Sequence, residues 1–62
     1  MNEPRFQPGQ HVRILHNWAK DLPPQIIDNA VWDEPWNCYT YALLGAAIRI
    51  EEHEIAPLEK AP

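Results

Sequence analysis

Apolar and polar residues alternate in several short segments of the chain, and prolines interrupt the stretches between them. In residues 10–15, Val12 and Ile14 alternate with polar neighbours, which is the period of a strand with one buried face. The dipeptide Pro8-Gly9 precedes this segment and suits the two central positions of a type II turn. We therefore expect a first strand at residues 10–15.

Three later segments also favour strands. Residues 25–32 are rich in β-branched side chains, and Asp28 in their middle indicates a bend or bulge. Residues 37–44 alternate in the same way, with rather apolar residues on both faces. Gly45 permits a sharp reversal, after which residues 46–50 place three apolar residues on one side. The pattern thus predicts four strands before the chain reaches its acidic end.

The connecting segments complete the predicted fold. Residues 16–25 are polar and contain two prolines, so we expect one long ordered loop after the first strand. We expect residues 51–54, E-E-H-E, to form a polar corner of the fold that contains a single 3₁₀ turn. Ile55 and Leu58 then return to the core in a fifth strand. A helix over residues 39–54 is the alternative, because alanine and leucine are good helix formers. Seven prolines and the β-branched alternation favour strands.

The length and charge of the chain restrict its function. Sixty-two residues support one domain, 1–62, folded over about 6–58 with frayed ends at 1–5 and 59–62. The net charge is −4, which disfavours nucleic acid as a partner. No apolar run approaches the roughly 20 residues of a membrane span, so membrane insertion is not expected. The lack of a secretory signal pattern and the single cysteine favour a cytoplasmic location.

Three sequence patterns follow one another between residues 6 and 58. They are F-x-P-G-x-x-V-R-I, a central W-x-x-Y-x-Y strand, and a closing E-x-E-I-x-x-L. The order resembles SH3-like small β-barrels, found as bacterial and plastid accessory domains and in nitrile-hydratase-type β-subunits. The resemblance implies an all-β, five-stranded barrel and a non-catalytic accessory role, although this fold hosts many functions. The residues that carry it are Phe6, Pro8, Gly9, Val12, Arg13, Ile14, Trp36, Tyr39, Tyr41, Glu52, Glu54, Ile55 and Leu58.

The three tryptophans are the most informative candidates for a contact surface. Trp32 and Trp36 bracket the turn D-E-P, and Trp18 lies in the long loop without apolar neighbours in sequence. Exposed indoles are common anchors of protein recognition. For Trp32 we favour packing in the core. For Trp18 and Trp36, packing in the core and contact with a partner are two equal alternatives. The predicted partner-binding surface joins the loop to the turn and comprises Trp18, Lys20, Trp32, Asp33, Glu34 and Trp36.

Metal and catalytic chemistry have little support. His11, His16, His53 and Cys38 show none of the close spacings of a metal site. Cys38 can lie beside His53 if neighbouring strands pair about Gly45, but so short a chain offers no enclosed pocket for nucleophilic catalysis. We therefore expect no catalytic residues, no metal and no cofactor, with Cys38 in a packing role.

Three functional hypotheses follow. The first is a small protein-binding module or accessory subunit whose partner is another protein or a larger complex, a homo-oligomer being compatible with it. The second is an acidic inhibitor or nucleic-acid-mimicking decoy that blocks a basic groove on another protein. The third, which the net charge disfavours, is direct binding of nucleic acid through Trp18, Arg13 and Lys20.

Overall fold

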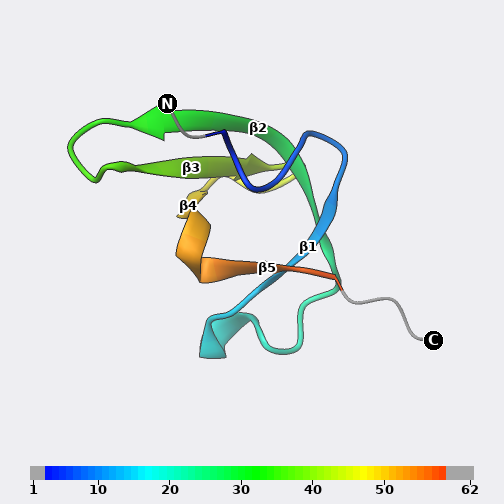
Figure 1. Ribbon diagram of the computed structural model, residues 1–62. Coiled ribbons are helices and arrows are strands. Elements are labelled where there is room, and N and C mark those ends of the chain that lie inside the picture. The colour runs from blue at the N-terminus through cyan, green and yellow to red at the C-terminus, as the bar shows by residue number, and fades with distance from the viewer. Residues whose placement is uncertain (1–2, 59–62) are drawn as a thin grey trace.

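Five antiparallel strands form one curled sheet in the computed structural model, which describes residues 3–58 (Figure 1). The sheet order is β4-β3-β2-β1-β5. Within the described residues the only helices are two three-residue 3₁₀ turns, η1 and η2, so the predicted all-β class is confirmed and the helical alternative is excluded. The elements are β1 (His11–Ile14), η1 (Asn17–Ala19), β2 (Gln25–Asp33), β3 (Cys38–Leu43), β4 (Arg49–Glu51), η2 (Glu52–Glu54) and β5 (Ile55–Pro57).

The long strand β2 belongs to both halves of the sheet. Its first residues pair with β1, and its residues from Ile27 onward pair with β3. The register shifts between Ile27 and Asn29, which confirms the predicted irregularity at Asp28. An extra residue of this kind bends a strand and increases its twist. The bend lets β1 and β5 cross below the β2–β3 hairpin in Figure 1.

Tyr41 lies at the centre of the core and joins it to the N-terminal segment. Its ring packs edge-to-face against Phe6, with centroids 5.4 Å apart. The Tyr41 hydroxyl donates to Glu52 Oε2 at 2.5 Å and accepts from the Phe6 N–H, while the Arg5 N–H donates to the same carboxylate oxygen. Burial and the Glu52 carboxylate raise the pKa of Tyr41 to about 12. The buried apolar residues are Phe6, Val12, Ile14, Ala19, Ile27, Tyr41, Leu43, Ile50 and Ile55.

Two residues that were predicted to face the core lie at the surface. Strand β4 begins only at Arg49, so the prediction of a strand at 46–50 was wrong in its first half, and Ile48 is exposed. The cause is the turn at 43–46, in which Gly45 has a φ of 80°, because pairing with β3 resumes only at Arg49. Leu58 follows the last residue of β5 and is also exposed, contrary to the prediction.

The loop after β1 is held to the body of the protein by η1. Ala19 in η1 is buried, and backbone hydrogen bonds from the Ala19 and Lys20 N–H groups close the turn. The predicted type II turn before β1 is also present, because Gly9 has a φ of 88° and the Gln10 N–H donates to the Gln7 carbonyl.

The predicted tail at 59–62 lies outside the described residues. None of the helices in residues 3–58 is long and apolar enough to cross a membrane.

Candidate functional site

The β2–β3 hairpin ends in a four-residue turn at 34–37. The Asn37 N–H donates to the Glu34 carbonyl at 3.1 Å, and Pro35 fixes the backbone at the second position of the turn. Asn37 has a φ of 54°, in the left-handed region that asparagine tolerates better than most residues. The local sequence D-E-P-W-N therefore sets the shape of the turn.

The two tryptophans of this turn differ in their contacts. Trp36 occupies the third position of the turn, and its side chain is 70% exposed. Trp32 is 37% exposed; its ring packs edge-to-face on Tyr39, and its Nε1–H donates to Glu34 Oε2 at 2.9 Å. Trp32 lies outside the buried core, so the expectation that it packs in the core was wrong. We name residues Trp32–Trp36 the hairpin tip, in which Trp36 is the free aromatic side chain.

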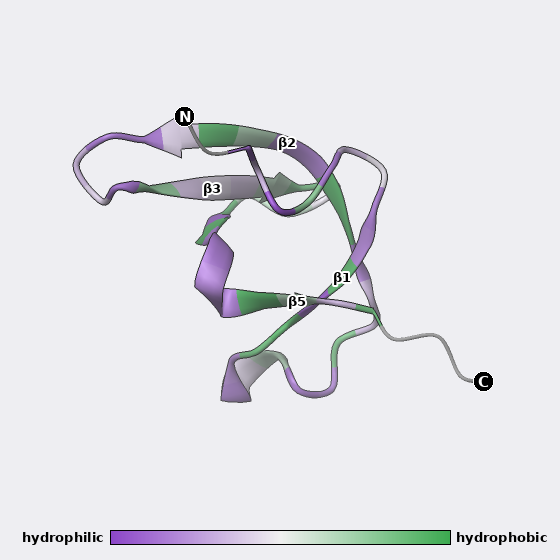
Figure 2. Ribbon diagram, viewed as in Figure 1, coloured by the Kyte–Doolittle hydropathy of each residue, from purple (hydrophilic) through white to green (hydrophobic). Residues whose placement is uncertain are grey.

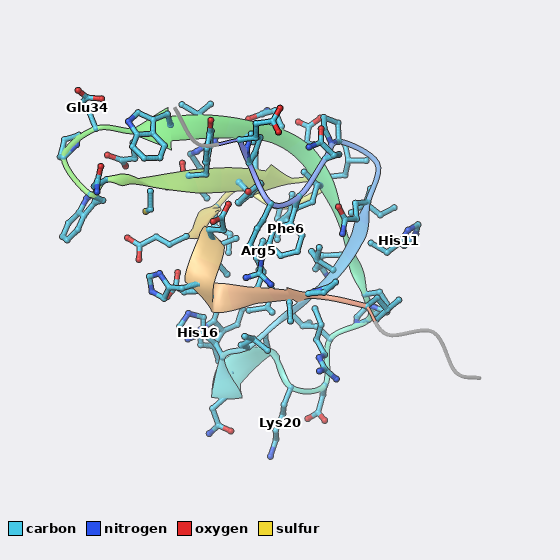
Figure 3. The ribbon with its side chains drawn as sticks, viewed as in Figure 1. Arg5, Phe6, His11, His16, Lys20 and Glu34 are labelled. Atoms are coloured by element: carbon cyan, nitrogen blue, oxygen red, sulfur yellow. The ribbon has the colours of Figure 1, made fainter. Side chains whose placement is uncertain are left out.

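The charges of the hairpin tip are acidic. Glu34 stands at the outer end of the hairpin in Figure 3, where it also holds the Trp32 indole. Asp33 is half-buried, and its carboxylate has no hydrogen bond or ion pair within residues 3–58. The short segment that carries the exposed Trp36 therefore also carries two acidic residues.

The structure places Trp18 and Lys20 away from the hairpin tip. Trp18 is 61% exposed and stacks on the His16 ring, with centroids 5.7 Å apart and planes inclined by 15°. Lys20 projects from the lower end of the molecule in Figure 3, whereas Glu34 stands at the upper end. The single surface expected from the sequence is thus divided into two separate surfaces.

The second surface contains a hollow that the sequence patterns did not reveal. It measures about 390 Å³ and is lined by the end of β1 together with η1 and the residue that follows it. We name it the basic hollow because two of its lining side chains are Arg13 and Lys20. The lining residues are Arg13, Ile14, Leu15, His16, Asn17 and Lys20.

The acidic run at 51–54 is the corner that the sequence predicted. The Glu54 carboxylate accepts the Glu51 N–H at 3.1 Å, and the Glu51 carboxylate accepts the N–H of Glu54 in return, which is a capping box. Figure 2 shows η2 as a hydrophilic segment between the apolar residues of β4 and β5. The Glu54 carboxylate also lies 2.6 Å from His16 Nε2, so this corner holds the loop after β1. The Glu51 hydrogen bond lowers the pKa of Glu54, and His16 contributes in the same direction.

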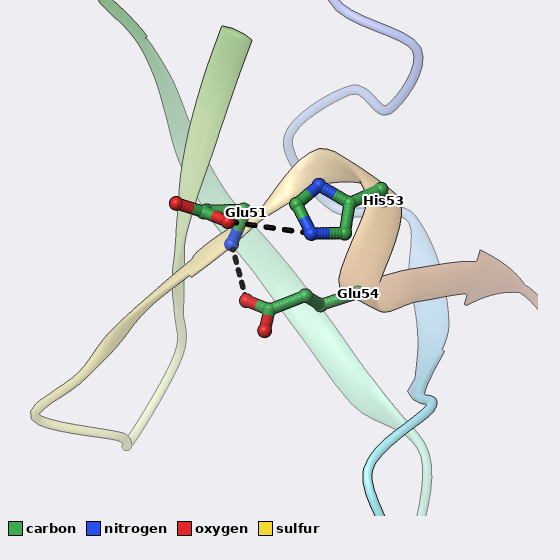
Figure 4. Close-up of side chains that lie close together, drawn as sticks. All are labelled: Glu51, His53 and Glu54. Atoms are coloured by element: carbon green, nitrogen blue, oxygen red, sulfur yellow. Dashed lines mark hydrogen bonds and ion pairs between the residues drawn. The ribbon is translucent and has the colours of Figure 1, made fainter. Parts of the chain in front are cut away.

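The same corner contains side chains of the types that bind metals. Among residues 3–58, Glu51, His53 and Glu54 bring one donor atom each within 4.8 Å of one another (Figure 4). His53 Nε2 lies 3.3 Å from Glu51 Oε1. Both carboxylates already accept backbone N–H groups of the turn, which accounts for their closeness without an ion.

Cys38 is in a poor environment for nucleophilic chemistry. Partial burial raises the pKa of its thiol, and the carboxylates of Glu51 and Asp33 raise it further. Because the thiolate is the reactive form of cysteine, a raised pKa lowers reactivity. This environment gives no support to a catalytic Cys38, while the expected absence of enzymatic activity stays a prediction.

Comparison with known proteins gives no relative for this chain. No family model, no curated protein and no solved structure matches it.

Proposed function

We propose that the chain is a small, non-catalytic, cytoplasmic protein-binding module or accessory subunit that contacts another protein through the hairpin tip. The observation that carries this proposal is the exposure of Trp36, 70% of whose side chain is open at the end of a defined turn. Covering an indole contributes on the order of 2 kcal/mol from apolar area alone. Tryptophan is also among the residue types that dominate the energy of protein interfaces.

The geometry of the hairpin tip favours binding because the backbone of the turn is already ordered before a partner binds. Asn37 and Pro35 define the turn, and the Trp32–Glu34 hydrogen bond fixes the neighbouring indole. A surface that is already ordered loses less conformational entropy when its partner arrives. The tip therefore offers an exposed aromatic side chain on an ordered turn.

The charge of the tip indicates the chemistry of the partner. Asp33 is the last residue of β2 and Glu34 the first residue of the turn, two positions before the exposed Trp36. Acidic groups at the rim of an interface favour partners with a complementary basic rim, and they act mainly on association rate and specificity. We expect the partner to present an apolar pocket bordered by lysine or arginine.

Affinity capture with the full chain tests this proposal. The wild type and the variants Trp36→Ala and Trp18→Ala are used as baits in one lysate, each at low and at high salt. We expect one partner to be retained by wild type and by Trp18→Ala, and to be lost with Trp36→Ala. The Trp18 variant is a matched control because Trp18 is a second exposed indole at a distance from the tip. A partner that survives Trp36→Ala and is lost with Trp18→Ala would place the contact at η1 and overturn the assignment.

The acidic decoy remains the second candidate. It requires carboxylates that are free to imitate phosphates, but Glu51, Glu52 and Glu54 are engaged in hydrogen bonds within the chain. The same capture experiment separates the two functions, because binding through carboxylates alone is lost at high salt in all three baits. An anchored indole keeps part of its affinity under those conditions.

A further inference from the structure

The basic hollow contains the two described cations that lack a partner. Arg49 donates to Thr40 and Asn29, and the Arg5 guanidinium lies over the Phe6 ring. Arg13 and Lys20 line the hollow, and within residues 3–58 neither side chain forms a hydrogen bond, an ion pair or a ring contact. Free guanidinium and ammonium groups are strong donors to carboxylates, so the hollow is suited to an acidic group.

The surroundings of the hollow restrict this acidic group. The Glu54 carboxylate lies 2.6 Å from His16 on one side, and Asp21 follows Lys20 in sequence on the other. These charges, together with the net charge of −4, oppose a polyanion such as nucleic acid. The exposed indole of Trp18 stacks on His16, which lines the hollow, so apolar surface adjoins it. The hollow therefore fits one or two carboxylates that are accompanied by an apolar side chain.

The hairpin tip of the same chain has this composition. It presents Asp33 and Glu34 beside the exposed Trp36. In Figure 3, Glu34 and Lys20 stand at opposite ends of the molecule, so the tip cannot reach the hollow of its own chain. Only a second copy can bring the two surfaces together.

We propose that two copies of this chain form a dimer with two-fold symmetry, in which the hairpin tip of each copy docks into the basic hollow of the other. In a two-fold interface every contact occurs twice, so the acidic tip and the basic hollow are both used in each copy. Each contact pairs Asp33 and Glu34 with Arg13 and Lys20, and covers the Trp36 indole. This arrangement accounts for the two unpaired cations and for the exposed acidic tip with one interface.

Charge reversal tests the dimer on the purified full chain, without any other protein. The first variant carries Arg13→Glu and Lys20→Glu, and the second carries Asp33→Lys and Glu34→Lys. Sedimentation velocity measures the dimer over a concentration series. Each variant alone opposes like charges at both contacts, and we expect its dimer to be at least about tenfold weaker than that of the wild type. Mixing the two variants restores opposite charges at both contacts, and we expect a heterodimer of about wild-type strength.

Matched controls keep the interpretation specific. A variant with Glu3→Lys and Asp28→Lys has the same change of net charge as the tip variant but alters exposed residues outside both surfaces. We expect this control to dimerise like the wild type. Recovery of the heterodimer also shows that both reversed variants are folded.

Three results would overturn the proposal: a wild type that is monomeric up to about 1 mM, a reversed variant that dimerises unchanged, or a mixture that stays monomeric. The corresponding dissociation constants are read directly from the concentration series. The dimer uses the same hairpin tip as the proposed function, so a docked tip cannot contact another protein at the same time. Capture of a partner from lysate and dimerisation of the pure chain are separate measurements, and either can fail without the other.

Discussion

The hairpin tip and the corner at 51–54 are both short, acidic turns, yet their side chains have different roles. At the corner, the carboxylates of Glu51 and Glu54 accept backbone N–H groups, and Glu52 binds the Tyr41 hydroxyl. At the tip, the Trp32 indole is the only side chain within residues 3–58 that forms a hydrogen bond with Asp33 or Glu34. One acidic turn is used within the fold, and the other is left available to a partner.

The position of each turn relative to the core explains this difference. The corner joins two short strands next to Tyr41 and the N-terminal segment, so its Glu52 carboxylate meets donors from within the fold. The tip lies at the end of the long β2–β3 hairpin, beyond the last core residue of either strand. An acidic run therefore indicates function only where the fold leaves its oxygens without internal donors.

The largest difference between the two turns is expected from removing one carboxylate at each. Glu52→Ala deprives the buried Tyr41 hydroxyl and the Arg5 N–H of their acceptor, and we expect it to lower the free energy of unfolding by about 1–3 kcal/mol. Glu34→Ala removes one exposed hydrogen bond, and we expect a loss below about 0.5 kcal/mol. Urea unfolding followed by tryptophan fluorescence measures both. Equal losses would contradict the distinction between the turns.

A backbone change at the tip is expected to have the next largest effect. Asn37→Val places a β-branched residue at a φ of 54°, and we expect a loss of about 1–2 kcal/mol in the free energy of unfolding. Asn37→Gly accepts this conformation and serves as the control, with a change within about 0.5 kcal/mol. Thermal unfolding of the two variants checks the prediction. A Val variant as stable as the Gly variant would show that the turn does not hold its left-handed residue.

The corner is also expected to confer a dependence of stability on pH. Because the pKa of Glu54 is lower in the folded protein than its ordinary value of 4.5, the unfolded chain binds its proton more readily. The contribution of Glu54 is complete above pH 4.5 and is lost as the pH falls through the lower folded pKa. We expect Glu54→Gln to flatten the decline of stability below pH 4.5, measured by urea unfolding at several pH values. An unchanged slope would exclude Glu54 as a source of this dependence.

The sequence was most informative where local chemistry decides the structure. Proline and glycine fix the turn before β1, Asp28 marks the bulge in β2, and the corner at 51–54 follows from a run of side chains that cap one another. Each of these features depends on residues that are neighbours in the chain. The prediction that Ile48 lies in a strand was wrong because the alternation of apolar and polar residues does not show where a turn ends and strand pairing resumes.

The candidate surfaces depend on contacts between distant residues, and the sequence predicted them less well. Nothing in the chain indicates that Glu54 lies against His16, or that Arg13 and Lys20 line one hollow. The expected joining of the loop after β1 to the hairpin tip came from shared composition, whereas the bend in β2 directs the two segments to different ends of the molecule. The residue types indicated candidate binding residues, but only the topology of the sheet shows that they lie on two separate surfaces.

The smallest effect on stability is expected at the residue with the largest proposed effect on binding. Trp36→Ala removes a side chain that is 70% exposed and packs on no core residue, so we expect the free energy of unfolding to change by less than about 0.5 kcal/mol. The contact between the Trp32 ring and the Tyr39 ring of β3 does not involve Trp36, so we expect it to persist in this variant. Urea unfolding followed by far-ultraviolet circular dichroism measures the change without relying on the removed indole. A loss above about 1 kcal/mol would show that Trp36 stabilises the hairpin itself, and loss of partner binding by this variant would then no longer identify a contact residue.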